Sequence, residues 1–310
     1  MKNRLLVLAG IVALGSSIAA FQASAQQQAP VVGTAAQLEV VKLKDNFYVI
    51  TSSSPTPRET FSGGNVSVFI TEKGVTLVDT KLANWGQALL DKLKTITPKP
   101  VTTIINTHTH SDHTGNDDKF GKVEIIAQEN TKANMAKLPA FAGDKAQFLP
   151  SKTFATTWTQ GSGKDEIQLY YFGRAHTNGD AWVVFPSLRV VHAGDIFSGK
   201  SVPLIDTSNG GSLLHISDSL KKAHDGIKNV DIVINGHMPS NTTWTDLAEY
   251  ADFTADLVAY GRAGFKAGKT PEQLAAEWKL PEKYKGYSPQ VANMMGGLVG
   301  RFQGLQKELQ

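Results

Sequence analysis

A histidine-rich decapeptide decides how this chain folds, and it reads Asn106-Thr107-His108-Thr109-His110-Ser111-Asp112-His113-Thr114-Gly115. It directly follows an apolar, β-branched run at residues 101–105, which predicts a buried strand that ends where the polar side chains begin. Neutral imidazole and carboxylate are donors that divalent first-row metal ions bind. His108 and His110 are two positions apart and point the same way in extended chain, whereas the adjacent Asp112 and His113 diverge. The stretch therefore predicts a metal site, with Asp112 and His113 serving a second metal.

Distant partners for this stretch follow the same order of apolar strand and polar turn. The candidates are His176, Asp195 and His237, each near a glycine that lets the backbone pass close to a site. A solvated histidine-rich turn is the simpler interpretation, but such tracts have no fixed spacing and no distant partners. We therefore expect the three stretches to converge on residues 108–113.

Five sequence blocks now stand in order: Asp79 at the end of Thr76-Leu77-Val78-Asp79-Thr80, the histidine-rich stretch, His176, Asp195 and His237. In these blocks the chain resembles the metallo-β-lactamase superfamily, from about residue 40 to about residue 240. The resemblance implies an α+β fold, a four-layer αββα sandwich, followed here by a C-terminal helical extension.

The resemblance also implies a ligand set of seven side chains: His108, His110 and His176 for one ion, Asp112, His113 and His237 for the other, and Asp195 as a bridge. Each ion then keeps an open position for water, as catalytic rather than structural sites do. The family position of Asp79 supports the ligand loop by orienting an imidazole. The simpler interpretation of Asp79 is a turn former at a strand end.

This ligand set predicts a hydrolase of small molecules. Two divalent ions, zinc in our expectation with iron or manganese as alternatives, generate a metal-bridging hydroxide from a shared water. The expected target is an ester, thioester, lactone or lactam-type bond, with Asp112 as the catalytic residue that orients the nucleophile or carries its proton. The β-lactamases of the superfamily have Cys or Ser where this chain has Asp195, which favours the glyoxalase II and lactonase-like branches. β-Lactamase activity, as a main or side activity, stays open.

Two further classes stay open. A mononuclear iron persulfide dioxygenase has a similar loop but binds its metal through two histidines and one aspartate. About one iron per chain, with oxygen uptake on glutathione persulfide, would indicate that class. A catalytically idle metal binder would hold two zinc ions yet hydrolyse nothing in a broad substrate panel.

The N-terminus has the pattern of a secretory signal. Lys2 and Arg4 precede an apolar segment that extends to about residue 20, and Ala23-Ser24-Ala25 predicts cleavage after Ala25. The chain has no cysteine, which excludes disulfides, a lipoprotein anchor and thiolate zinc ligands. We therefore expect a periplasmic or secreted protein without a stable membrane anchor.

Charge and composition limit the possible partners and the domain organisation. Loss of the two bases Lys2 and Arg4 lowers the formal net charge from +3 to +1, so nucleic acid is not an expected partner. Homo-oligomer formation is left open. The predicted organisation is a signal peptide at 1–25, a flexible lead-in at 26–37, a catalytic domain at 38–240 and a helical extension at 241–310.

Other segments carry weaker signals. Periodicity predicts hairpins at residues 38–51 and 65–78 and a helix at 85–96, while residues 139–158 form either a pocket wall or a hairpin packed on the core, with packing favoured. The loops at 52–64 and 197–215 are expected to border the site, with Arg58 and Phe61 as candidate substrate contacts. His215 is expected at a helix start, and Ser288-Pro289 is expected to begin a last helix that ends at Leu309.

Overall fold

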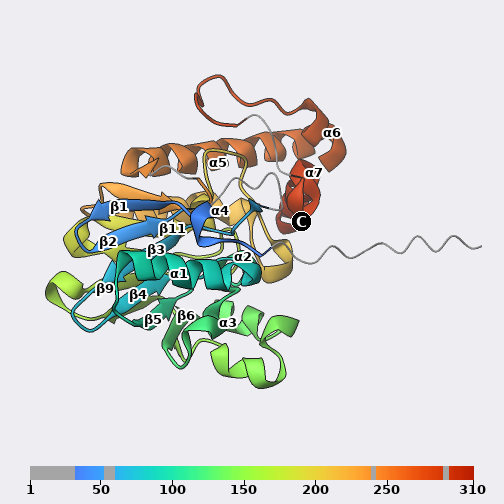
Figure 1. Cartoon of the computed structure of the whole chain (residues 1–310). Helices are drawn as coiled ribbons and strands as arrows, with labels where there is room; N and C mark the ends of the chain where they lie inside the picture. Colours follow the sequence, from blue (N-terminus) through green and yellow to red (C-terminus); the bar gives the residue numbers. More distant parts are fainter. Residues whose placement is uncertain (1–31, 52–59, 239–241, 289–292) are drawn as a thin grey trace, which may run out of the picture. The chain divides into compact units, whose positions relative to one another are not determined.

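The computed structural model describes residues 32–51, 60–238, 242–288 and 293–310. The predicted signal peptide, the first half of the lead-in and Arg58 lie outside the described residues. Residues 31–310 form one compact unit. In its described part, two stacked sheets have helices on their outer faces (Figure 1). This arrangement is the expected four-layer αββα sandwich.

The first sheet holds seven strands among the described residues, in the order β1 (Val40–Lys44), β2 (Phe47–Ile50), β3 (Val66–Ile70), β4 (Val75–Val78), β5 (Val101–Ile105), β6 (Glu124–Gln128) and β7 (Lys152–Phe154). The first four strands pair antiparallel, which confirms both predicted hairpins, and the last four pair parallel. Parallel pairing brings the carboxyl ends of β4 and β5 to one edge of the sheet.

The second sheet has six strands in the described part of the chain, in the order β13 (Thr242–Thr243), β12 (Ile232–Asn235), β11 (Val190–Gly194), β10 (Trp182–Phe185), β9 (Ile167–Tyr170) and β8 (Thr157–Gln160). Only the pair β11 and β12 is parallel among these described strands. The carboxyl ends of β11 and β12 therefore also meet at one edge.

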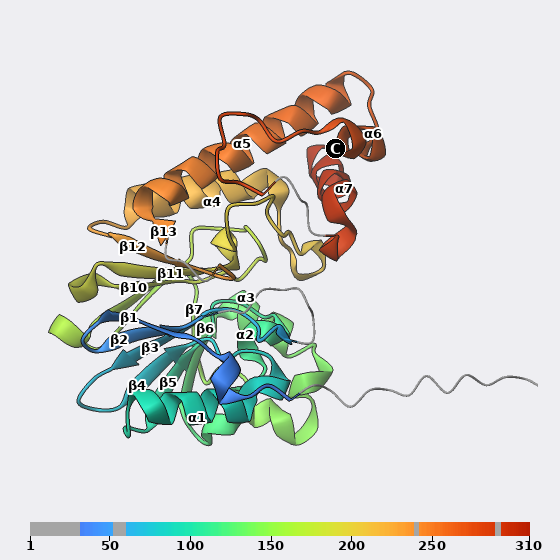
Figure 2. The ribbon, with the colours of Figure 1, turned by 45° about the horizontal axis from the view of Figure 1, so that its top comes forward.

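Apolar side chains fill each space between the layers. Between the sheets, the Phe185 ring lies 4.7 Å from the Phe47 ring and 5.2 Å from the Phe69 ring, measured between centroids. Helix α1 (Gly86–Ile96) covers the first sheet with Leu89 and Leu93, as its 3.6-residue apolar period predicts. Helices α4 (Leu213–Gly226) and α5 (Trp244–Lys266) cover the second sheet (Figure 2).

Residues 139–158 do not form a hairpin, so that alternative was wrong. Their two strands separate, because β7 pairs with β6 in the first sheet and β8 pairs with β9 in the second. The chain thus passes from one sheet to the other here, because β7 is the edge strand of the first sheet and β8 is the edge strand of the second. Phe154 joins the core between the sheets, as expected for packing, while Phe141 and Phe148 line a cavity.

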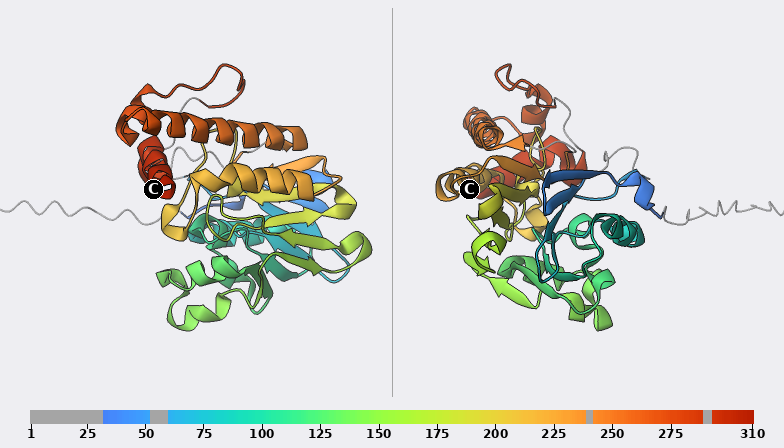
Figure 3. Two further views of the ribbon diagram at one scale, coloured as in Figure 1. Left: turned by 180° about the vertical axis from the view of Figure 1, so that it is seen from behind. Right: turned by 60° about the vertical axis from the view of Figure 1, so that its left-hand side comes forward.

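The C-terminal residues form the expected helical extension. Helix α6 (Pro271–Glu277) begins with a capping box at Thr270, and helix α7 (Gly297–Leu309) is the last helix (Figure 3). The predicted start of the last helix at Ser288 was wrong, because Met295 and Gly296 have φ of +53° and +77° and interrupt the helical backbone. None of the helices among the described residues is both long and apolar enough to cross a bilayer.

Candidate metal centre

The ends of four strands bring the predicted donors together. His108 and His110 follow β5, and the short helix α2 (Ser111–Thr114) then carries Asp112 and His113. His176 lies in the turn between β9 and β10. The parallel pair β11 and β12 delivers Asp195 and His237, since Gly194 and Asn235 are register partners. All seven predicted side chains converge, in two groups.

The first donor set is His108, His110, His176 and Asp195. The Nδ1 atom of His110 lies 3.1 Å from Nε2 of His108 and 3.0 Å from Nε2 of His176. Asp195 Oδ2 lies 3.7 Å from His176 Nε2. Three imidazole nitrogens therefore surround one point with a carboxylate beside it.

The second donor set is Asp112, His113 and His237. The Nε2 atom of His237 lies 3.4 Å from both His113 Nε2 and Asp112 Oδ2. Asp195 also reaches this set, with Oδ2 3.1 Å from His237 Nε2 and Oδ1 3.4 Å from His113 Nε2. Asp195 thus lies between the two sets, where the resemblance had placed a bridge.

Hydrogen bonds on the far side of the rings decide which nitrogen carries the proton. A carboxylate or carbonyl only accepts, so His110 Nε2 donates to Asp206 Oδ2 at 2.7 Å and His176 Nδ1 donates to Leu204 O at 2.8 Å. His113 Nδ1 likewise donates to Asp79 Oδ2 at 2.7 Å. When such a ring is neutral, its other nitrogen, which faces the remaining donors, keeps its lone pair.

Asp79 supports two ligand segments at once. Its Oδ1 accepts the backbone N–H of Thr107 at 2.8 Å, and its Oδ2 accepts from both Thr107 Oγ1 and His113 Nδ1 at 2.7 Å. Asp79 is fully buried and has the left-handed φ of +66°. These contacts favour the supporting role over that of a turn former alone.

The roles of Asp206 and Leu204 were not predicted from the sequence. Both lie inside the loop that was expected to border the site, and both orient histidines of the first set. Asp206 also accepts the backbone N–H groups of Ser208 and Asn209, as Asx turns do. That turn pattern was visible in the sequence, but nothing in it indicated which histidine the second carboxylate oxygen reaches.

The electrostatics of the cluster suit metal ligands. Burial, reinforced by neighbouring imidazoles, lowers the pKa of His108 well below its usual value and lowers the pKa of His176 to about 4. Both rings are therefore neutral at pH 7. Burial also lowers the pKa of His113, but Asp112, Asp195 and Asp79 outweigh it and raise this pKa well above the ordinary value. The field at the second set thus favours positive charge.

The segment at residues 60–65 closes over the second donor set. Gly64 donates its N–H to Asp112 O at 3.0 Å, and Asn65 donates its N–H to Gly236 O at 2.8 Å. The Phe61 ring lies 5.6 Å from the His237 ring, so the predicted substrate contact does border the donors. Lys81 Nζ holds this segment by donating to Gly64 O at 2.8 Å.

The remaining histidines lie apart from both donor sets. His192 is buried in β11 and shares a 2.9 Å hydrogen bond with Ser67. His215 lies in the first turn of α4, as expected, and His224 of the same helix stacks on Trp244. None of the three belongs to either donor set among the described residues.

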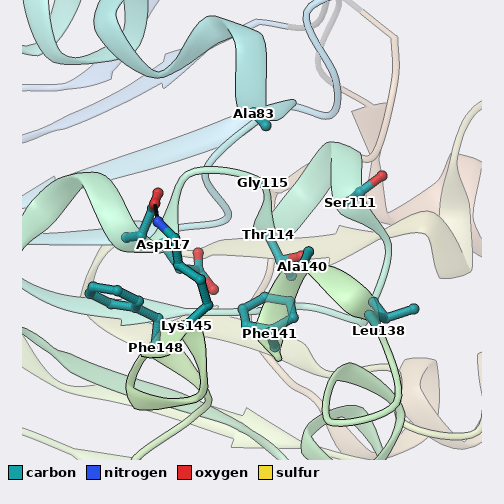
Figure 4. A pocket seen from close by; sticks show the side chains of 11 residues that line it. Ala83, Ser111, Thr114, Gly115, Asp117, Leu138, Ala140, Phe141, Lys145 and Phe148 are labelled. Carbon is teal, nitrogen blue, oxygen red and sulfur yellow. Dashed lines mark hydrogen bonds and ion pairs between the residues drawn. The ribbon is translucent and has the colours of Figure 1, made fainter. Parts of the chain in front are cut away.

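A cavity of about 210 Å³ lies behind α2 (Figure 4). Ser111, Thr114 and Gly115 line it from one side, while Phe141 and Phe148 line it from the other. Positions three and four apart share one helix face, so these α2 residues face away from the donors Asp112 and His113. None of the seven donors is among the described residues that line this cavity.

Known proteins resemble this chain in both sequence and structure. Residues 60–262 match the family described as the metallo-beta-lactamase superfamily. The chain is 30% identical over 239 residues to metallo-beta-lactamase type 2 of Elizabethkingia meningoseptica, which spans 72% of this chain and 86% of that relative. A metallo-beta-lactamase from Pontibacter korlensis superposes with a TM-score of 0.59 and 22% identity, over 70% of this chain and 99% of that one. The sec-alkylsulfatase Pisa1 from Pseudomonas sp. superposes with a TM-score of 0.70 and 16% identity, over 87% of this chain and 50% of that one.

Proposed function

The chain belongs to the metallo-beta-lactamase superfamily and is a metal-dependent hydrolase, and from this premise we propose that it binds two divalent ions and cleaves an ester, thioester, lactone or lactam-type bond. Zinc is the proposed ion, with iron or manganese as alternatives, because imidazole and carboxylate donors without thiolate suit all three. The substrate is proposed to be a small molecule.

One observation carries this proposal: the second ring nitrogens of His108, His110 and His176 are hydrogen bonded to Thr107, Asp206 and Leu204, so in the neutral rings the nitrogens that approach one another at 3.0 and 3.1 Å are unprotonated. Two unprotonated nitrogens cannot hydrogen bond, and their lone pairs repel at this distance. A cation at their centre turns the repulsion into three ligand bonds. The donor set therefore fits a metal ion better than it fits a hydrogen-bonded cluster.

The second set extends the same reasoning to a second ion. His113, His237 and Asp112 bring two imidazoles and a carboxylate within 3.4 to 3.7 Å of one another, with Asp195 shared. If these donors held a second divalent ion, the pair would supply a water with a pKa near 7 and a positive field at the bond under attack. A mononuclear dioxygenase uses fewer donors, so the second set favours the hydrolase.

The protein itself contributes orientation and proton transfer. Asp195 reaches both sets and would hold them in register, while Asp79 and Asp206 fix the rings of His113 and His110. Asp112 is partly exposed, whereas its neighbour His113 is fully buried. We propose that Asp112 orients the attacking water and carries its proton to the leaving group.

Metal analysis and a substrate panel test the proposal. The wild-type chain is expected to hold about two ions and to turn over at least one ester, thioester, lactone, lactam, phosphodiester or alkyl sulfate. His110→Ala should lose about one ion and reduce turnover by about 100-fold or more, while His215→Ala, outside the donor sets, should match the wild type. Retained turnover in His110→Ala would contradict the site, and about one iron per chain with oxygen uptake on glutathione persulfide would identify a dioxygenase instead.

β-Lactam hydrolysis is the second candidate, because the E. meningoseptica relative is a metallo-beta-lactamase. Asp195 stands against it as the main activity, since the β-lactamases of the superfamily carry Cys or Ser at that position. A nitrocefin assay beside a lactone and a thioester assay ranks the candidates by kcat/KM. A lactam value at least about tenfold above the others would make β-lactamase the main activity.

We also propose that the protein is exported and cleaved after Ala25. The basic residues Lys2 and Arg4, the apolar segment behind them and the absence of cysteine support this proposal. The test is N-terminal sequencing of protein isolated from the producing cells. A mature chain that begins at Gln26 is expected, and a chain that begins at Met1 would overturn the proposal.

A further inference from the structure

The loop at residues 198–211 lies between the first donor set and the C-terminal helices. On its inner side, Leu204 O accepts from His176 Nδ1 at 2.8 Å and Asp206 Oδ2 accepts from His110 Nε2 at 2.7 Å. The backbone N–H of Asp206 also donates to His176 O at 2.9 Å. Two of the three imidazoles in this set are therefore oriented by one short stretch of the loop.

Arg301 of α7 contacts the outer side of the same stretch. Its side chain is buried, with 1% of the residue exposed, and its Nε donates to the carbonyl of Pro203, which directly precedes Leu204. Its Nη1 donates to the carbonyls of Gly297 and Met294, at the start of α7. Burial lowers the pKa of Arg301 to about 10, so the guanidinium remains charged at neutral pH. Its hydrogen bonds to carbonyls are therefore charge-assisted.

The extension also holds the two ends of this loop. At the first end, Lys200 O accepts from Ser288 N at 2.9 Å, and Lys200 Nζ lies 2.5 Å from Asp246 Oδ1 of α5. At the far end, Ser212 Oγ donates to Glu308 Oε2 of α7 at 2.8 Å. A loop held at three points has little freedom left, so its carbonyl and carboxylate groups keep their positions before an ion binds.

We propose that Arg301 is a positioning residue for the first donor set. By fixing the Pro203 carbonyl, it fixes the neighbouring groups that orient His176 and His110. The C-terminal extension thereby contributes to metal affinity, although none of its residues is among the seven donors. This inference rests on the proposed metal-binding function and assigns a further part of the chain to it.

Metal affinity, rather than activity, tests the inference. The metal-free full-length chain is titrated with Co²⁺ in competition with a chromophoric chelator, and the d–d absorption reports the ligand field. Arg301→Met, which keeps the stem but removes the donors, is expected to weaken Co²⁺ binding by about 10- to 100-fold, as losses of groups that orient ligands do. The loss should appear in a His237→Ala background, where the first set is intact, and be absent in a His110→Ala background.

Tyr260→Phe is the matched control. It removes a 3.0 Å hydrogen bond from Tyr260 Oη to Leu274 O, inside the extension and away from the loop. Tyr260→Phe should leave Co²⁺ affinity unchanged. If it instead weakened Co²⁺ binding as much as Arg301→Met does, the cause would be a general loosening of the extension and not the contact of Arg301 with the loop.

The outcomes separate the inference from the proposed function. If the wild type binds no Co²⁺, the proposed function fails; if wild type and Arg301→Met bind equally, only the inference fails. Should Arg301→Met not fold, the double variant Lys200→Met with Glu308→Met removes the side-chain contacts at the two ends of the loop, at partly exposed residues. That variant is expected to bind more weakly in the His237→Ala background, and unchanged affinity would overturn the inference.

Discussion

Two glycines show how little space the donor cluster leaves. A Cβ on Gly236 would lie 1.9 Å from Asp195 Oδ1, and a Cβ on Gly64 would lie 2.2 Å from His113 Cε1. Both distances are far inside van der Waals contact. Neither glycine has a positive φ, so close approach to the donors, rather than backbone conformation, requires glycine here.

Gly236→Ala is therefore expected to displace the Asp195 carboxylate. Because that group serves both donor sets, metal content should fall and turnover should drop by about 100-fold or more, while the fold persists. Metal analysis and far-UV circular dichroism measure the two effects. Gly226→Ala is the control, since its Cβ would meet only the Phe172 ring, at 3.0 Å. Full metal content in Gly236→Ala would contradict the bridging role.

His192 makes stability depend on pH. Burial lowers its pKa from 6.5 to about 4, so the unfolded chain takes up a proton at a higher pH than the folded chain does. Stability is therefore complete above pH 6.5 and decreases as the pH falls toward 4, by about 3 kcal/mol in the limit. The His192→Gln variant lacks this contribution to the pH dependence of stability. The donor histidines contribute equally in the variant and in the wild type.

The test is urea unfolding of wild type and His192→Gln at several pH values. The advantage of the wild type in free energy of unfolding should shrink between pH 7 and pH 4. A constant difference across this range would show that folding does not lower the pKa of His192.

At the scale of elements, Lys81 joins strand and loop. Its buried Nζ donates to Thr51 O after β2, at 2.8 Å, and to Gly64 O and Ser62 Oγ in the segment over the second donor set, at 2.8 and 3.3 Å. Lys81→Met removes these three hydrogen bonds together with a buried amine whose pKa burial lowers to about 7, and we expect a net loss of about 2 kcal/mol in free energy of unfolding.

Chemical denaturation measures that loss, with Lys73→Met at an exposed turn as the control. Binding of the second ion should weaken in Lys81→Met, because the segment also holds Asp112 O and Gly236 O. A variant as stable as the wild type would indicate that relief of the buried charge balances the lost hydrogen bonds.

Prediction from the sequence worked where a pattern is local. The hairpins and α1 show apolar periodicity, the strand before His108 is a β-branched run, and the donors follow strand ends, so their convergence was predictable. Whether β7 and β8 pair with each other depends on which sheet edges are free, which no local pattern records. Asp206 and Arg301 were missed for the same reason, since their partners lie far along the chain and become neighbours only after folding.

At the scale of the whole molecule, metal and stability are coupled. Without ions, the facing lone pairs and the carboxylates Asp112 and Asp195 repel; with ions, the same groups become ligands. An ion at 100 times its Kd adds about 2.7 kcal/mol per site. A chelator should therefore lower Tm by about 5 °C or more, and added Zn²⁺ should restore it. A Tm that changes neither with chelator nor with added Zn²⁺ would contradict the metal centre.

Each sheet is built from an unbroken stretch of chain, because β1–β7 end at Phe154 and β8–β13 begin at Thr157. Each donor set nevertheless takes side chains from both stretches: His108 and His110 meet His176, while Asp112 and His113 meet His237. A bound ion is thus a reversible cross-link between two halves of the protein. If the chain is cut between Phe154 and Thr157, we expect the two fragments to associate more tightly with divalent ions than without them.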